Sequence, residues 1–158
     1  MIALRFERSE DIWELLFRKD TFDSFLLQEA SLEHDYAMTL EHSAAGGQDV
    51  PYSRVRPLLN AFIRQTENPA ENIPSPKGHI VLKASDGYQK SLVSKPSFTS
   101  DPDIIKGLIL TFRLENETFT VLTGISYQSF TLDKSIDTLW DQAILRSFDH
   151  MNIAFTQL

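Results

Sequence analysis

The sequence contains no cysteine among its 158 residues. Such a chain forms no disulfide, binds no zinc or iron–sulfur cluster through thiolates and uses no thiol nucleophile. The absence of cysteine fits a protein that works in the reducing environment of the cytoplasm. We therefore expect a cytoplasmic protein whose fold has no covalent cross-link.

Long apolar stretches are missing as well. No run of apolar residues approaches the roughly 18 that a membrane-spanning helix needs. The first residues read MIALRFERSED, with a charge already at Arg5 and no apolar segment of the kind that signal peptides contain. We expect a protein that neither carries a signal peptide nor crosses a membrane.

Positive charge is scarce. The chain has 15 lysine and arginine residues against 22 aspartate and glutamate residues, which gives a net charge of −7. An acidic chain gains no general attraction to the phosphates of nucleic acid or to an anionic membrane surface. The charge balance therefore argues against nucleic acid and membrane as partners, and it leaves a protein partner or a homo-oligomer open.

Core-forming residues, by contrast, are plentiful. Hydrophobic residues make up 42% of the chain, and eleven phenylalanines are among them. The length is that of one ordinary domain. We predict a single folded domain over residues 1–158.

The spacing of the apolar residues predicts the fold class. Alternating apolar residues indicate strands, and apolar residues three and four apart indicate helices. The predicted strands cover residues 2–6, 25–31, 37–40, 79–84, 108–114, 119–121 and 127–132. The predicted helices cover residues 9–17, 55–63, 85–94 and 136–148, and residues 43–51 have the composition of a loop. The sequence thus predicts an α+β protein with an antiparallel sheet covered by three or four helices.

A possible internal repeat divides the chain. The order strand, helix, hairpin, helix occurs once in residues 1–66 and again in residues 79–150, with a proline-rich connection at 67–78. If the halves are related, a pseudo-two-fold axis would join them into one sheet. The alternative is that any two amphipathic hairpins look alike. The order also loosely resembles the halves of a sliding-clamp domain, which leaves a clamp-like nucleic-acid accessory as one functional alternative.

Three acidic residues near a predicted helix–strand junction form the first candidate site. Asp20, Asp23 and Glu29 could hold a hard divalent cation through their carboxylates. Their spacing does not match a calcium-binding loop. The alternative is ordinary turn and cap chemistry, for which aspartate is well suited.

Two arginines at the predicted start of a helix form the second candidate site. Arg54 and Arg56, close to Tyr52, could grip a carboxylate or phosphate with paired hydrogen bonds. The alternative is that both arginines are simply solvated. If they converge with Asp20, Asp23 and Glu29, the sequence would fit a divalent-metal-dependent hydrolase or nuclease.

No familiar catalytic or cofactor motif is present. The four histidines have no metal-binding spacing, and neither a GxSxG motif nor a phosphate-binding glycine loop occurs. Asp133, Asp137 and Asp141 are expected on the charged solvent face of the last helix. The sequence predicts no cofactor and no metal site, and the leading hypothesis is a non-enzymatic accessory or binding protein that acts through a partner or oligomer surface.

Several segments together have a familiar pattern. They are MIALRF at the start, DTFDSFLLQEA at 20–30, YSRVRPLLNAFI at 52–63 and the stretch 107–141, of which residues 130–141 are the most specific. With these segments the chain resembles a family of small uncharacterised bacterial proteins classified as a domain of unknown function. The resemblance implies a bacterial cytosolic protein, and it implies no activity, cofactor or site residue.

Overall fold

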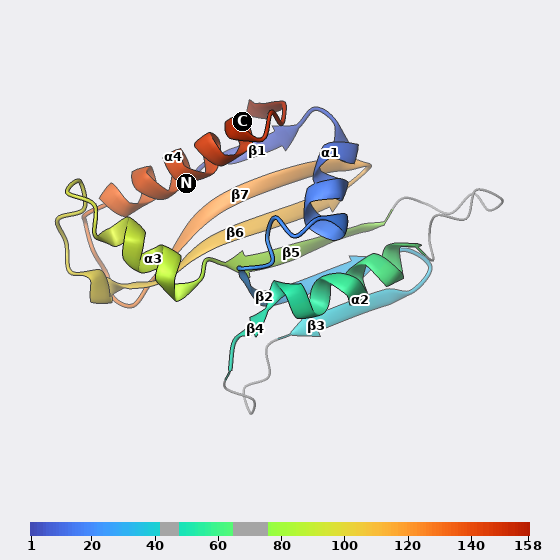
Figure 1. Ribbon diagram of the computed structural model, residues 1–158, viewed down its shortest axis with the longest axis horizontal. Helices are drawn as coiled ribbons and strands as arrows, with labels where there is room; N and C mark the ends of the chain where they lie inside the picture. The colour runs from blue at the N-terminus through green and yellow to red at the C-terminus, as the bar shows by residue number, and fades with distance from the viewer. Residues whose placement is uncertain (42–47, 65–75) are drawn as a thin grey trace.

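The computed structural model describes residues 1–41, 48–64 and 76–158. Within these ranges the chain forms four α-helices and one eight-stranded antiparallel sheet (Figure 1). The predicted α+β class is confirmed. No described helix is long and apolar enough to cross a membrane.

Seven strands run side by side across the sheet, and every hydrogen-bonded pair is antiparallel. In order across the sheet they are β3 (Ala37–Glu41), β2 (Leu26–Glu33), β5 (Lys77–Lys83), β6 (Ile105–Glu115), β7 (Thr118–Tyr127), β1 (Ala3–Phe6) and β8 (Phe155–Gln157). The two-residue strand β4 (Val50–Pro51) pairs with β2 off this path. The β6–β7 hairpin turns at Asn116 and Glu117, which both have positive φ.

The helices lie close to the ranges that the spacing of the apolar residues predicts. They are α1 (Ser9–Trp13), which continues as a π-helical turn over Glu14–Arg18, α2 (Tyr52–Arg64), α3 (Asp86–Val93) and α4 (Ser135–His150). A short 3-10 turn covers Pro102–Ile104. Pro57 lies inside α2, beyond its first turn, because the helix already begins at Tyr52. The Tyr52 amide donates a hydrogen bond to the Phe25 carbonyl, 2.8 Å away. This bond connects the start of α2 to the residue just before β2.

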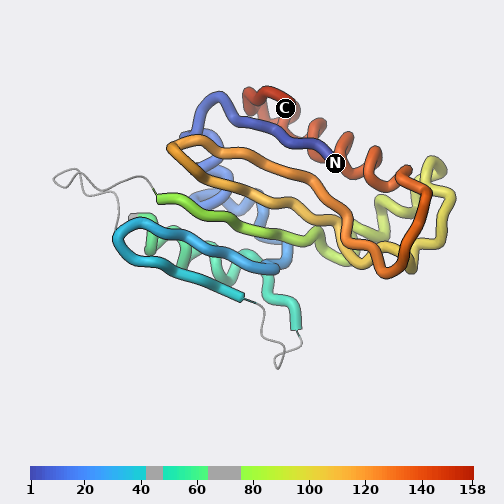
Figure 2. The backbone as a smooth tube through the Cα atoms, turned by 180° about the vertical axis from the view of Figure 1, so that it is seen from behind, coloured from blue at the N-terminus to red at the C-terminus, as the bar shows by residue number. Residues whose placement is uncertain are grey.

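The core lies between the sheet and one layer of helices. Figures 1 and 2 show α1, α2 and α4 on the same side of the sheet, while the other side carries no helix in the described part of the chain. On β6 the side chains alternate accordingly: Leu110 and Phe112 are buried in the core, whereas Arg113 is exposed. The sheet therefore has a helix-free face, on which polar side chains of neighbouring strands lie next to one another.

Four features of the structure differ from the elements predicted from sequence. The strand predicted at 127–132 is absent because β7 ends at Tyr127 and a loop over 128–134 leads into α4. The short strand β8 was missed, because three residues are too few for a visible alternation. The predicted loop at 43–51 lies mostly outside the described residues, and its last two residues form β4. The proline-rich connection predicted at 67–78 also lies mostly outside them, and it ends earlier than expected because β5 begins at Lys77.

Candidate functional site

Two of the predicted site residues form one ion pair. The Arg56 guanidinium donates from Nε to Asp23 Oδ1 at 2.8 Å and from Nη2 to Asp23 Oδ2 at 3.0 Å. Both side chains are only about one-fifth exposed, 22% for Arg56 and 23% for Asp23. This two-point contact joins α2 to the segment between the π-helical turn and β2, and it occupies both groups.

A buried tyrosine supports this joint. Tyr52 is completely buried, and its hydroxyl donates to the Leu16 carbonyl at 2.7 Å. Burial raises the pKa of the Tyr52 phenol far above its ordinary value, so the group stays neutral. The hydrogen bonds from Arg56 to Asp23 raise the pKa of the guanidinium further, because they favour its charged form. The cluster has the properties of a structural contact between α2 and the π-helical turn.

The other predicted site residues lie apart from this pair or have no contact with it. Asp20 is exposed and acts on Arg56 only through its charge. Arg54 is exposed on α2. Glu29 lies on β2, where its Oε1 is 3.1 Å from His79 Nε2 on the neighbouring strand β5. Among the described residues no group of three or more histidine or acidic side chains could hold a metal ion.

The helix-free face of the sheet carries a row of polar side chains from five strands. The strand register places Ser31 opposite His79, His79 opposite Arg113 and Arg113 opposite Thr120. Thr120 in turn lies opposite Arg5 on β1. We call these five residues the cross-strand row. The inter-strand spacing separates the Cα atoms of Arg5 and Arg113 by about 9.5 Å.

Two hollows lie along this row. Their volumes are about 680 Å³ and about 470 Å³, and they share Arg113 and Glu115. The larger hollow extends over β2, β5 and β6, and the smaller one lies over β6, β7 and β1. The two hollows therefore adjoin at Arg113 and Glu115 on the helix-free face.

The charges of this face are unevenly paired. Glu29 contacts His79, and Lys77 lies opposite Glu33 in the strand register. Arg5 and Arg113 are both exposed, and neither has a hydrogen bond or ion pair within the residues that the structure describes. A guanidinium offers a planar set of donors that matches a carboxylate with two parallel hydrogen bonds. The face therefore has two arginines available for anionic groups.

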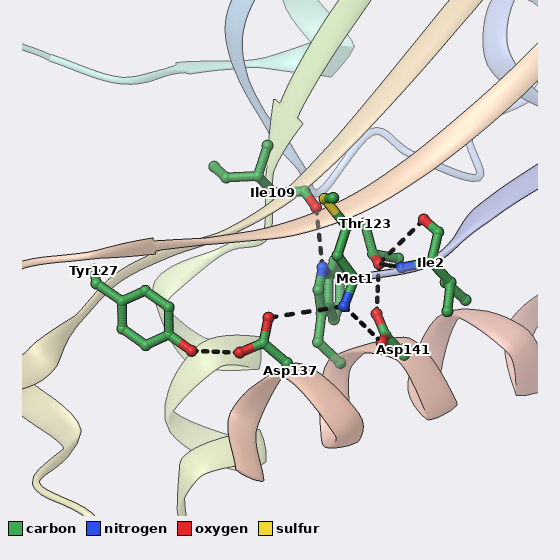
Figure 3. Close-up of polar contacts among 8 residues, drawn as sticks. Met1, Ile2, Ile109, Thr123, Tyr127, Asp137 and Asp141 are labelled. Atoms are coloured by element: carbon green, nitrogen blue, oxygen red, sulfur yellow. Dashed lines mark hydrogen bonds and ion pairs between the residues drawn. The ribbon is translucent and has the colours of Figure 1, made fainter. Parts of the chain in front are cut away.

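A second polar cluster lies on the opposite face of the sheet, where α4 packs on β7 (Figure 3). The amino group of Met1 is 3.0 Å from Asp141 Oδ2 and 3.8 Å from Asp137 Oδ1. Thr123 accepts a hydrogen bond from the Ile2 amide and donates to Asp141. The nearby Trp140 indole donates to the Ile109 carbonyl at 2.9 Å. These contacts connect α4 to β7 and to the first two residues of the chain.

The expectation that Asp137 and Asp141 lie on a solvent-exposed face of α4 is wrong. Their side chains are only 22% and 15% exposed. The Tyr127 hydroxyl donates a hydrogen bond to Asp137. Burial is the main cause that raises the pKa of this tyrosine, and the hydrogen bond to Asp137 is the second. The spacing on α4 could not reveal these contacts, because the partners lie outside the helix, on β7 and in the first residues of the chain.

The cross-strand row was also missed from sequence. The alternation at 79–84 and 108–114 assigns His79 and Arg113 to one face of two predicted strands, so the signal existed. The order of the strands, which brings Arg5 of β1 beside them, was the missing information.

A family model described as a family of unknown function, DUF5721, matches residues 15–156. The chain belongs to this family. The match includes strands β2 to β7 and helices α2, α3 and α4, whereas β1 and α1 precede it. It confirms the resemblance to a domain without assigned function. No curated protein and no solved structure matches the DUF5721 chain. DUF5721 membership supplies no ligand or reaction, so the helix-free face has to be judged on its own geometry.

Proposed function

We propose that this chain is a non-enzymatic binding protein that holds a carboxylate-rich segment of a partner protein on the helix-free face of its sheet. The observation that carries the proposal is the pair Arg5 and Arg113, which are exposed, without partners among the described residues, and on one cross-strand row. Charge complementarity therefore selects an anionic occupant.

The surroundings of the two arginines favour carboxylates over a phosphate backbone. Thr120 lies between the arginines and offers a hydroxyl. Glu115 lines both hollows, and Glu29 and Glu33 line the larger one. These acids repel a dense row of phosphates, whereas separate carboxylates can meet each arginine individually.

The two alternatives from the sequence have less support. A metal-dependent hydrolase needs Asp23 and Arg56 to be available, but they occupy each other. A clamp-like nucleic-acid accessory needs an extended basic surface, and the chain as a whole carries a net charge of −7.

Two wider proposals accompany the binding role. The absence of cysteine supports a place in the cytoplasm. We propose a bacterial origin because the segments quoted above resemble those of a family of small bacterial proteins. The order β1, α1, β2, β3, α2 followed by β5, α3, β6, β7, α4 supports one domain over residues 1–158 with two related halves. The halves would not be equivalent, because β5 pairs with β6 of its own half whereas β1 pairs with β7 of the other.

The binding role can be tested with a fluorescein-labelled peptide that repeats Glu-Pro-Pro. In a polyproline helix residues three apart share one side and are separated by about 9.3 Å, which matches the spacing of the two arginines. We expect fluorescence anisotropy to show binding at least about tenfold tighter than that of a Gln-Pro-Pro control peptide. Arg5→Ser and Arg113→Ser should each abolish this preference. The matched control Arg146→Ser changes an exposed arginine on α4 and should bind as the unchanged protein does. Equal binding of both peptides, or undiminished binding by the Arg113 variant, would refute the proposal.

A further inference from the structure

The loop over residues 128–134, which joins β7 to α4, presents two large apolar side chains to water. Phe130 is 88% exposed and Leu132 is 85% exposed, the highest values among the large hydrophobic residues of the described chain. Burying either side chain would stabilise the protein through the hydrophobic effect, but this chain buries neither. A partner surface would gain that free energy on binding.

The loop that carries these side chains is held at both ends. The Gln128 amide donates to the Ile104 carbonyl at 2.6 Å. At the other end Ser100 donates to Asp133, and Asp133 Oδ1 accepts from the Ser135 amide at 2.9 Å. These bonds fix the backbone on either side of the two apolar side chains. A prearranged loop loses less conformational freedom on binding, which favours a docking role.

The same chain contains a hollow with the complementary chemistry. It has a volume of about 260 Å³ and lies where the last turns of α4 meet the segment before β2. Its apolar lining residues are Phe22, Phe25, Ile144, Phe148 and Met151. An engineered apolar cavity of about 150 Å³ in another protein holds a benzene molecule, so this hollow has room for a phenyl ring.

A chain cannot fill this hollow with its own loop. The loop precedes the first residue of α4, whereas Ile144 and Phe148 lie in the last turns of that helix (Figure 1). At 1.5 Å of rise per residue, the helix separates the two features by roughly 15–20 Å. The occupant has to come from another molecule, and a second copy of this chain always brings the matching side chain.

We propose that Phe130 of one copy enters the hollow at the end of α4 in a second copy, so that copies associate head to tail. Leu132 packs beside the ring at the edge of the contact. The two surfaces in this contact are different, so the contact is heterologous. A pair of copies therefore keeps one unused loop, on one copy, and one unused hollow, on the other. This inference is independent of the proposed function, which concerns the opposite face of the sheet.

The experiment measures molecular mass by sedimentation equilibrium over a series of protein concentrations. Phe130→Ser removes the inserted ring, and Ser147→Trp places an indole over the hollow from an exposed position on α4. We expect the unchanged protein to gain mass with concentration and each variant to remain monomeric. An equal mixture of the two variants should form a dimer and nothing larger, because only one intact loop and one intact hollow remain.

Two matched controls accompany these variants. Tyr36→Ser removes an exposed aromatic ring elsewhere, and Gln142→Trp adds an indole to α4 away from the hollow. Both should associate as the unchanged protein does. Circular dichroism verifies folding, and Ser147→Lys replaces Ser147→Trp if the latter does not fold.

Three results would overturn the inference. The first is an unchanged protein that stays monomeric at its highest soluble concentration. The second is undiminished association of Phe130→Ser. The third is undiminished association of Ser147→Trp, which would indicate a symmetric contact between two loops.

Discussion

The pair Asp23 and Arg56 gives a quantitative test of the fold, because the structure assigns it to stability. A double-mutant cycle with Asp23→Ala, Arg56→Ala and the combined variant isolates the energy of the contact. Exposed ion pairs contribute about 0.2–1 kcal/mol, whereas breaking a buried pair costs about 3–5 kcal/mol. With two hydrogen bonds and side chains about one-fifth exposed, this pair should lie between these limits, at about 1–2 kcal/mol.

Urea denaturation followed by tryptophan fluorescence measures each free energy of unfolding. With a slope of about 2 kcal/mol per molar urea, the coupling corresponds to a midpoint change of about 0.5–1 M. Arg54→Ala is the matched control, because Arg54 is exposed on the same helix, and its effect should stay within about 0.5 kcal/mol. A coupling energy below about 0.3 kcal/mol would show that the pair does not join α2 to the segment before β2.

Two further predictions concern a glycine and a buried tyrosine. Gly78→Ala should destabilise the protein strongly, since a Cβ there would lie 1.8 Å from the Ser31 carbonyl oxygen. The control Gly87→Ala in α3 places a Cβ that meets nothing within 4 Å, and it should stabilise the protein by about 0.5–1 kcal/mol. Thermal unfolding that ranks the stabilities of the two variants the other way would contradict the register of β5. Tyr52→Phe removes the hydrogen bond to Leu16 and should cost about 1–3 kcal/mol at neutral pH. Because burial raises the pKa of Tyr52, the contribution of its phenol to folding stability is complete below about pH 10 and declines as the pH rises further. Between about pH 9 and 11 the Phe variant should therefore lose less stability than the unchanged protein does. The same pH dependence in both proteins would argue against a buried phenol.

The parts of the fold that could be predicted from sequence are those with local periodicity. The alternation through Leu108, Leu110 and Phe112 identified β6, and the stripe from Ile136 to Phe148 identified α4. Such signals need only neighbours in sequence. The apolar residues Phe130 and Leu132 also alternate, but the segment forms a loop, in which Asp133 accepts a hydrogen bond from the Ser135 amide.

Contacts between distant segments could not be predicted in this way. Asp23 and Arg56 were both selected as candidate residues, but their spacing of 33 positions does not indicate that they bind each other. The row from Ser31 to Arg5 depends on the order of five strands, and hydrophobic patterns specify strands without specifying their neighbours.

The central claim is that the helix-free face binds carboxylates through Arg5 and Arg113. The most direct test titrates the ¹⁵N-labelled protein with the Glu-Pro-Pro peptide and records the amide chemical shifts. The structure predicts saturable shifts confined to β1, β5, β6 and β7 around the cross-strand row, and the same residues should stay unshifted with the Gln-Pro-Pro peptide. Shifts that are absent, or that fall on α2 and α4 instead, would contradict the claim.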